Sequence, residues 1–333
     1  MRLQRWTTLT LFAAMALVAV GCASEAGSVS GISGADASVA ADGDAGAGGD
    51  QNDGATVDTG AAVDTGAAVA DTTPTAPTPP APFSYTGGSC PTLKAGANDL
   101  WSWSAVRKID IYLPSEPKGA GLLTLWHGLG DTKENFGPAM GASALANALH
   151  VVVVVPQSAG KLAGWGWADD KDATEDAALF DDILACTDAQ FDIDNGRVFT
   201  MGFSAGALWS SWLVLNRGSF LASAVIWSGG SGSKANVYKT PKRKLPVLMA
   251  WGGPKDEVMV NFQEMTKHMA SKLATDGHYV VLCDHGLGHT IPSNGLKWAV
   301  TFLNKHTFAT TGNSPLDDDA AAVAEFPSYC VFP

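Results

Sequence analysis

The chain has 333 residues, of which 46% are hydrophobic, and a formal net charge of −12 at pH 7. Acidic residues outnumber basic ones by 33 to 21, and no basic patch stands out, so the sequence argues against a nucleic-acid partner.

The first 22 residues have the pattern of an export signal. Arg2 and Arg5 precede an apolar run, residues 9–20, which is too short to span a bilayer permanently. The run closes on small residues and Cys22, a pattern that resembles bacterial lipoprotein signals. We therefore predict a membrane attachment through a lipid on Cys22. No aspartate follows in the next two positions to favour retention at the inner membrane, so the predicted anchor lies in the outer membrane or at the cell surface. An ordinary signal peptide, giving a secreted protein, is the alternative. A lipid-anchored protein and a secreted protein would both lie outside the cytoplasm.

Residues 23–82 consist mainly of Ala, Gly, Asp, Thr and Pro. A six-residue motif occurs twice, at 57–62 and 63–68, and the segment carries nine acidic residues and no basic one. Such a composition cannot bury a core, so we predict a disordered spacer that ends in a stiff proline-rich stretch.

Residues 83–333 alternate between strand-like and helical patterns, which predicts one α/β domain with a largely parallel sheet and helices on both faces. Predicted strands cover 106–113, as an edge strand, and 122–126, 151–155, 197–202, 222–227, 245–251 and 279–283. The five valines of 151–155 predict a central strand, because the run is β-branched and too short for a helix. Predicted helices cover 174–190, with Thr174 as N-cap, and 205–215, 261–274 and 296–306. The tail from Thr307 receives no assignment.

Four cysteines remain besides Cys22, an even number in a chain predicted to be exported. They are Cys90, Cys186, Cys283 and Cys330. One or two disulfides are expected, with three full pairings possible, and buried thiols without a bridge are the alternative.

A G-x-S-x-G pentapeptide, Gly202–Gly206, lies between a predicted strand and a predicted helix. This is the placement of a nucleophile elbow, in which glycines permit a strained turn and the serine projects above the sheet edge. Ser204 is therefore the predicted nucleophile of a serine hydrolase.

A serine hydroxyl needs a base to act as a nucleophile at neutral pH. His289 follows the last predicted strand, on a loop between glycine and Thr-Ile-Pro, and is the predicted base; His285 is the competitor. The orienting acid should lie between serine and histidine, just past a strand end. Asp256 fits, with Glu257 and Asp276 as alternatives. The order Ser204, Asp256, His289 is that of the α/β-hydrolase fold.

Acyl transfer also needs donors for the oxyanion that develops on the carbonyl. We predict the backbone N–H groups of Ala205, at the start of the helix, and of Leu129, in the glycine-containing loop after residues 122–126. His127 in the same loop is expected to hold that loop in place.

With these segments in place, residues 106–292 resemble the extracellular polyhydroxybutyrate depolymerases and the feruloyl and acetylxylan esterases. The resemblance lies in His127–Asp131, Phe191–Asp194 with Arg197–Phe199, Gly202–Gly206 and Gly288–Pro292. It implies cleavage of carboxylic esters in a polymer or its fragments, through an acyl-serine intermediate and without a cofactor.

Three tryptophans, Trp165, Trp167 and Trp227, fall near the same edge of the predicted sheet, where exposed indoles could bind substrate. Loop packing is the alternative for each. The acids Asp169, Asp170, Asp172, Glu175 and Asp176 have no regular ligand spacing, so a solvated helix start is expected there rather than a calcium site. No metal site is predicted.

The sequence thus predicts an exported, monomeric serine esterase that acts on a polymeric or oligomeric ester. A peptidase of the same fold and a catalytically inactive surface binding lipoprotein are the alternatives.

Overall fold

The computed structural model describes residues 77–310 and 313–333. The predicted signal segment 1–22, with Cys22, and the predicted spacer as far as residue 76 lie outside the described residues. Residues 77–82, the end of that spacer, contain no helix or strand. Within the described ranges, no helix is long and apolar enough to cross a membrane.

Nine strands of the described residues form one sheet, in the order β1-β2-β4-β3-β5-β6-β7-β10-β11. They are β1 (Gly96–Ser102), β2 (Ala105–Tyr112), β3 (Gly121–Trp126), β4 (Val151–Pro156), β5 (Val198–Phe203), β6 (Ser223–Trp227), β7 (Val247–Trp251), β10 (Val280–Asp284) and β11 (Cys330–Val331). The strands from β4 to β10 in this order are parallel, and β1, β2 and β11 pair antiparallel. The predicted, largely parallel sheet is therefore confirmed.

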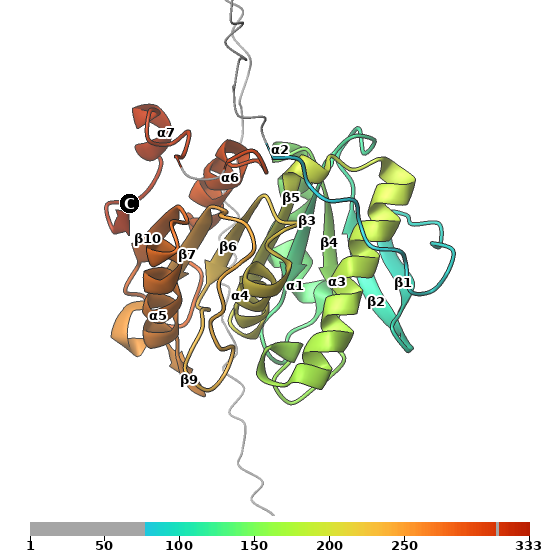
Figure 1. Cartoon of the computed structure of the whole chain (residues 1–333), viewed down its shortest axis with the longest axis horizontal. Helices are drawn as coiled ribbons and strands as arrows, with labels where there is room; N and C mark the ends of the chain where they lie inside the picture. The colour runs from blue at the N-terminus through green and yellow to red at the C-terminus, as the bar shows by residue number, and fades with distance from the viewer. Residues whose placement is uncertain (1–76, 311–312) are drawn as a thin grey trace, which may run out of the picture. The chain divides into compact units, whose positions relative to one another are not determined.

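Helices cover both faces of the sheet. They are α1 (Lys133–Ala139), α2 (Ala142–Ala148), α3 (Asp170–Phe191), α4 (Ala205–Arg217), α5 (Phe262–Thr275), α6 (Gly295–Lys305) and α7 (Ala320–Val323). One apolar core joins the sheet to α3, α4 and α5, which lie in front of it in Figure 1. A second core joins the opposite face to α1, α2 and α6. The chain therefore has the predicted α/β architecture.

The five consecutive valines of β4 lie in a sheet that is covered on both faces. Val152 and Val154 belong to the core on the α3 side, whereas Val151, Val153 and Val155 belong to the core on the other side. Successive side chains of a strand point to opposite faces, so a strand covered on both faces needs apolar residues at every position.

The structure differs from the sequence-based expectation at the first strand. β1, which was not predicted, pairs with β2 and takes the edge position expected for residues 106–113. Only Leu100 of its apolar residues is fully buried, so β1 has little hydrophobic alternation of its own. Its pairing with β2 defines the strand instead.

The start of α3 also differs from the prediction. Asp169, not Thr174, is the N-cap, because its carboxylate accepts hydrogen bonds from the N–H groups of Lys171 and Asp172. The Thr174 hydroxyl donates to the carbonyl of Asp170 inside the helix. Several Ser, Thr and Asp residues near one helix start compete for the cap, and local sequence does not rank them.

The four cysteines form two disulfides. Cys90–Cys186 joins the segment before β1 to α3, and Cys283–Cys330 joins β10 to β11. Both are consistent with an extracytoplasmic protein, since disulfides persist in oxidising compartments. The second disulfide holds β11, part of the C-terminal tail that received no assignment, at the edge of the sheet.

His306, at the end of α6, makes the stability depend on pH. Its ring is fully buried, Nδ1 donates to the carbonyl of Phe302, and Nε2 accepts from the hydroxyl of Ser314. Burial lowers the pKa of His306 from 6.5 to about 4, although Asp317 acts in the opposite direction. Between these two values the unfolded chain binds a proton that the folded chain does not, so the free energy of unfolding falls as the pH falls.

We expect His306 to contribute a loss of about 2 kcal/mol in the free energy of unfolding between pH 7 and pH 5. Urea unfolding at both pH values should show this extra loss in the wild type relative to His306→Gln. The other buried histidines are present in both proteins, so their contributions cancel in the comparison. Equal pH dependence of the two proteins would contradict the prediction.

Candidate active site

Ser204 lies in a sharp turn between β5 and α4, with φ 57° and ψ −121°, a conformation that is rare for serine. A Cβ atom on Gly202 would lie 2.2 Å from the carbonyl oxygen of Gly206, and one on Gly206 would lie 1.9 Å from that of Trp126. Neither position can hold a side chain, so the two glycines are required by the turn. The N–H of Ser204 donates to the carbonyl of Trp227 on the neighbouring strand, at 3.0 Å.

The structure brings Ser204, His289 and Asp256 together. Nε2 of His289 lies 2.9 Å from Oγ of Ser204, and Nδ1 lies 2.6 Å from Oδ1 of Asp256. An ionised carboxylate only accepts hydrogen bonds, so Nδ1 carries the hydrogen and Nε2 is left to accept from the serine hydroxyl. This neutral tautomer is the one that a general base requires.

The loops that carry the acid and the histidine contact each other. The histidine loop follows β10, and the acid follows β7 through the 3₁₀ turn Gly253–Lys255. The N–H of Gly288 donates to the carbonyl of Gly252 at 2.9 Å. A Cβ atom on Gly252 would lie 1.8 Å from the carbonyl oxygen of Gly288, so this close approach requires glycine.

Asp256 is fully buried and uses both of its carboxylate oxygens. Oδ1 accepts from His289, while Oδ2 accepts from the hydroxyl of Ser228 at 2.7 Å and from the N–H of Gly252 at 2.8 Å. These donors satisfy the hydrogen-bonding capacity of the buried carboxylate and hold it in one orientation.

The residues considered as alternatives for the acid and the base lie in other environments. Glu257 is exposed in β8 (Glu257–Val258), and Asp276 accepts a hydrogen bond from the hydroxyl of Tyr238. Nδ1 of His285 accepts from the N–H of Leu287, and burial lowers the pKa of His285. Within the described part of the chain, none of the three is hydrogen-bonded to Ser204 or to His289.

Sequence reasoning missed Ser228, which follows β6 directly. It is fully buried, has φ +56°, and its N–H donates to the carbonyl of Ala250 at 2.8 Å. Serine rarely adopts this backbone conformation, and such strain persists where surrounding contacts impose it. The only local signal was a serine immediately after the predicted strand 222–227.

We expect Ser228→Ala to lower kcat for ester hydrolysis about tenfold with little change in KM, because the acid loses one of its donors and holds the imidazole less firmly. Steady-state kinetics should show the same loss for Ser228→Gly, in which the backbone is relaxed at positive φ. Ser210→Ala is the matched control, since that buried hydroxyl contacts Thr200 instead. Full activity of Ser228→Gly would mean that the hydroxyl is not required.

The imidazole of His289 is packed between two aromatic rings that sequence reasoning also missed. The Phe203 ring centroid lies 4.8 Å away, and that of Phe262 lies 4.7 Å away, stacked at 19°. Phe262 begins α5, and its N–H donates to the backbone carbonyl of Asp256 at 3.0 Å. The same short segment therefore positions both the acid and one face of the imidazole.

The two predicted oxyanion donors lie on the expected segments. A Cβ atom on Gly128 would lie 3.5 Å from Cβ of Ser204, so the loop that carries Leu129 packs against the nucleophile. No acceptor among the described residues is hydrogen-bonded to the N–H of Leu129 or of Ala205. Such N–H groups at a loop and at a helix N-terminus can receive a developing negative charge.

His127 holds this loop, as expected. Its Nδ1 donates to the carbonyl of Gly128 at 2.8 Å, and its Nε2 accepts from the N–H of Ser158 at 3.2 Å. Burial lowers the pKa of His127, which fits a neutral ring with both nitrogens occupied. The ring is therefore structural.

The expectation of exposed indoles is wrong for two of the three tryptophans. Trp165 is 1% exposed and donates from Nε1 to the carbonyl of His127, and Trp227 is 0% exposed and packs on Trp298. Both indoles stabilise the core beneath the site and present no surface to a substrate. Trp167 is half-buried and packs against the cluster that contains Phe262, so it remains a candidate.

Three of the five acids at the start of α3 are paired with basic side chains. Lys161 contacts Asp172 at 3.0 Å and Glu175 at 2.9 Å, and Arg107 contacts Asp176 at 2.9 Å. Asp176 is buried rather than solvated. In residues 77–310 and 313–333, no group of three His, Cys, Asp or Glu side chains is placed to hold a metal ion.

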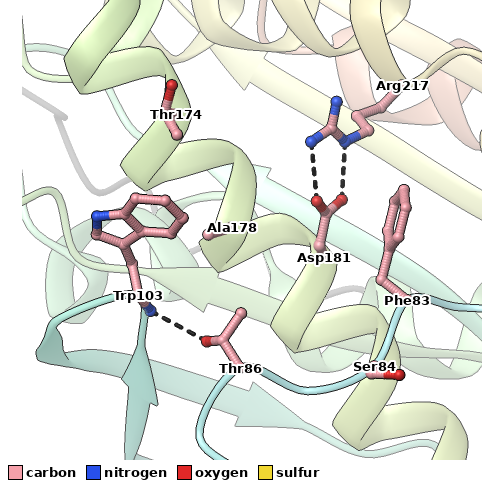
Figure 2. Close-up of a pocket in the computed structure, with 8 residues that line it drawn as sticks. All are labelled: Phe83, Ser84, Thr86, Trp103, Thr174, Ala178, Asp181 and Arg217. Carbon is pink, nitrogen blue, oxygen red and sulfur yellow. Dashed lines mark hydrogen bonds and ion pairs between the residues drawn. The ribbon is translucent and has the colours of Figure 1, made fainter.

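A separate pocket of about 440 Å³ lies between the segment before β1 and α3, and it shares no residue with the triad (Figure 2). Its polar groups bond to one another: the guanidinium of Arg217 forks onto Asp181 at 2.8 and 2.9 Å, and the N–H of Trp103 donates to the hydroxyl of Thr86. Among the residues that line this pocket, no hydroxyl is hydrogen-bonded to a histidine, in contrast to the hydroxyl of Ser204.

Comparison with known proteins identifies the family of this chain. A family model described as phospholipase/carboxylesterase matches residues 109–307, more than half of the chain. No curated protein matches significantly in sequence.

Two solved structures, sOPH and pOPH, show the same fold at low identity. The native structure of sOPH is 18% identical, with 74% of this chain and 96% of that chain covered and a TM-score of 0.59. Native pOPH is 18% identical over the same shares, with a TM-score of 0.58. An esterase from Pyrobaculum calidifontis is 17% identical, with 65% of this chain and 86% of that chain covered and a TM-score of 0.49.

By its sheet and by the extent of the family match, this chain belongs to the phospholipase/carboxylesterase family of α/β-hydrolases.

Proposed function

We propose that this protein is an exported serine carboxylesterase that cleaves polymer-linked esters, of the feruloyl, acetylxylan or polyhydroxyalkanoate type, through an acyl-serine intermediate. The observation that carries the proposal is the pair of hydrogen bonds that joins Ser204 through His289 to the buried Asp256. Membership of a carboxylesterase family supports ester hydrolysis in general. The polymer substrate rests on the resemblance of the motifs.

The proposed reaction uses only groups of this chain and water. Ser204 attacks the ester carbonyl while Nε2 of His289 takes the hydroxyl proton, and Asp256 stabilises the imidazolium through Nδ1. The N–H groups of Leu129 and Ala205 bind the oxyanion. His289 then gives its proton to the leaving alcohol, and water repeats the sequence to release the acid and restore the serine.

We further propose that the enzyme is a monomer outside the cytoplasm, either attached through a lipid on Cys22 or secreted. The two disulfides and the export pattern of residues 1–22 support the compartment. The lipid itself rests on the sequence pattern around Cys22.

The function is tested with p-nitrophenyl acetate and butyrate, feruloyl and acetyl sugars, a polyhydroxybutyrate film and p-nitroanilide peptides. A Ser204→Ala preparation serves as the blank for contaminating activity. We expect turnover of the esters and none of the anilides. Cleavage of anilides alone would support a peptidase, and no turnover of any substrate would support a binding protein.

A further inference from the structure

The N–H of Leu129 belongs to the same peptide group as the carbonyl of Gly128. Every peptide bond in the described residues is trans, so the N–H and the carbonyl of this group point in opposite directions. The carbonyl accepts a hydrogen bond from Nδ1 of His127 at 2.8 Å. The direction of the proposed oxyanion donor therefore depends on where His127 lies.

His127 is held by the loop of residues 157–169, which joins β4 to α3. Its backbone carbonyl accepts a hydrogen bond from Nε1 of Trp165 at 2.9 Å. Its ring nitrogen Nε2 accepts from the N–H of Ser158 at 3.2 Å. The position of this loop thus determines the position of His127.

Asp176 of α3 fixes the loop beside Trp165. The carboxylate is fully buried, and its Oδ2 accepts a hydrogen bond from the N–H of Gly166 at 2.8 Å. A Cβ atom on Gly166 would lie 2.4 Å from the backbone nitrogen of Ala173, so the loop lies directly against the helix there. Asp176 therefore holds the backbone next to the indole that binds His127.

Arg107 of β2 fixes the same loop beside Ser158. Its guanidinium contacts Oδ1 of Asp176 at 2.9 Å and donates to the carbonyl of Gln157 over 3.5 Å. The ion pair of Arg107 and Asp176 is thus connected to both of the loop segments that bind His127.

Stability alone does not account for this ion pair. Two buried charges lose their hydration, and replacing such a pair by apolar residues is often neutral or stabilising. Burial raises the pKa of Asp176, although Arg107 and Lys161 act in the opposite direction. The net rise means that the lost hydration outweighs the attraction to these two cations. A role that requires a defined geometry fits such a pair.

We propose that Arg107 and Asp176 are positioning residues that direct the N–H of Leu129 at the oxyanion, through the 157–169 loop and His127. This inference rests on the proposed function and adds two side chains to it. Neither side chain is hydrogen-bonded to a triad residue in the described part of the chain. Their loss should therefore weaken the oxyanion donor and leave the triad in place.

The test compares Arg107→Met/Asp176→Leu with the wild type on p-nitrophenyl butyrate. Both charges are replaced, so neither is left buried without its partner. We expect kcat to fall about ten- to one-hundredfold with KM within about twofold, because a misplaced donor weakens binding of the transition state and not of the ester.

A trifluoromethyl ketone measures the oxyanion donor separately. Ser204 adds to its carbonyl carbon, the hydroxyl proton passes to His289, and the carbonyl oxygen becomes an oxyanion. The affinity of the double variant for this inhibitor should fall by the same factor as kcat/KM. A variant that had lost only stability would keep the wild-type affinity.

Asp181→Asn is the matched control, because Asp181 lies in the same helix and forms an ion pair with Arg217 at 2.8 and 2.9 Å. Its kcat and its affinity for the ketone should stay within about twofold of the wild type. Trp165→Phe removes the donor to His127 and keeps both charges. It should show the same losses as the double variant, and it decides the question if the double variant does not fold.

Wild-type kcat in the folded double variant or in Trp165→Phe would overturn the inference. So would an equal loss in Asp181→Asn, or a fall in kcat with unchanged affinity for the ketone. If the wild type does not hydrolyse p-nitrophenyl butyrate, the proposed function fails instead, so the two failures are distinguishable.

Discussion

Ser204→Ala is expected to lower kcat for p-nitrophenyl butyrate by about 10⁶-fold, because no other hydroxyl in the described residues is hydrogen-bonded to His289 and the oxyanion donors alone retain only a small part of the acceleration. The substitution removes one oxygen atom and keeps a non-glycine residue at φ 57°. We therefore expect the thermal midpoint to change by no more than a few degrees. The measurement is steady-state hydrolysis together with a thermal melt on the same preparation.

Ser210→Ala provides the control for the loss of a buried serine, in the helix that follows Ser204. Its hydroxyl lies 3.3 Å from that of Thr200, and no hydrogen bond in the described residues joins it to His289. We expect its kcat to stay within twofold of the wild type. A Ser204→Ala protein that kept more than about one hundredth of wild-type activity would exclude Ser204 as the nucleophile.

Asp256→Asn is expected to lower kcat by about 10⁴-fold with a small change in KM. An amide that donates toward Nδ1 would leave His289 with its hydrogen on Nε2, and that tautomer cannot accept the serine proton. The acid is fully buried, so water cannot replace the lost carboxylate. Esterase kinetics on p-nitrophenyl butyrate measure the effect directly.

Glu257→Gln is the matched control, because it is the adjacent carboxyl group in the chain and is exposed. Its kcat should remain within twofold of the wild type, as should that of Asp276→Asn, whose carboxylate is bound to Tyr238. The reverse pattern, with a loss at Glu257 and none at Asp256, would assign the orienting role to Glu257.

The predicted site residues differ in how much local sequence says about them. The turn at Ser204 is encoded locally, because neither Gly202 nor Gly206 can carry a side chain there. His289 followed from chain order after the last predicted strand. For the acid, the sequence left Asp256 and Glu257 open, since the direction in which each of two neighbouring carboxylates points depends on the tertiary structure.

The functional residues that the sequence did not predict contact the triad through long-range interactions. Ser228 and Phe262 belong to elements far from Ser204 in sequence, and their roles depend on contacts with Asp256 and His289 that no short-range pattern encodes. The expectation that the indoles of Trp165 and Trp227 are exposed was wrong for the same reason. Trp165 and Trp227 lie near the right sheet edge, but their indoles point into cores built from other segments.

Local chemistry in the chain was enough to predict the alternating strands and helices, the glycine-lined elbow, and the order of nucleophile, acid and base. These features depend on backbone sterics and on hydrophobic period, which act over a few residues. Folding in three dimensions decided the rest: the edge strand β1, the pairing of the four cysteines, the choice of Asp256 over Glu257, and the burial of Trp165 and Trp227. Each of these depends on which distant segments come into contact, and packing of the whole domain determines that.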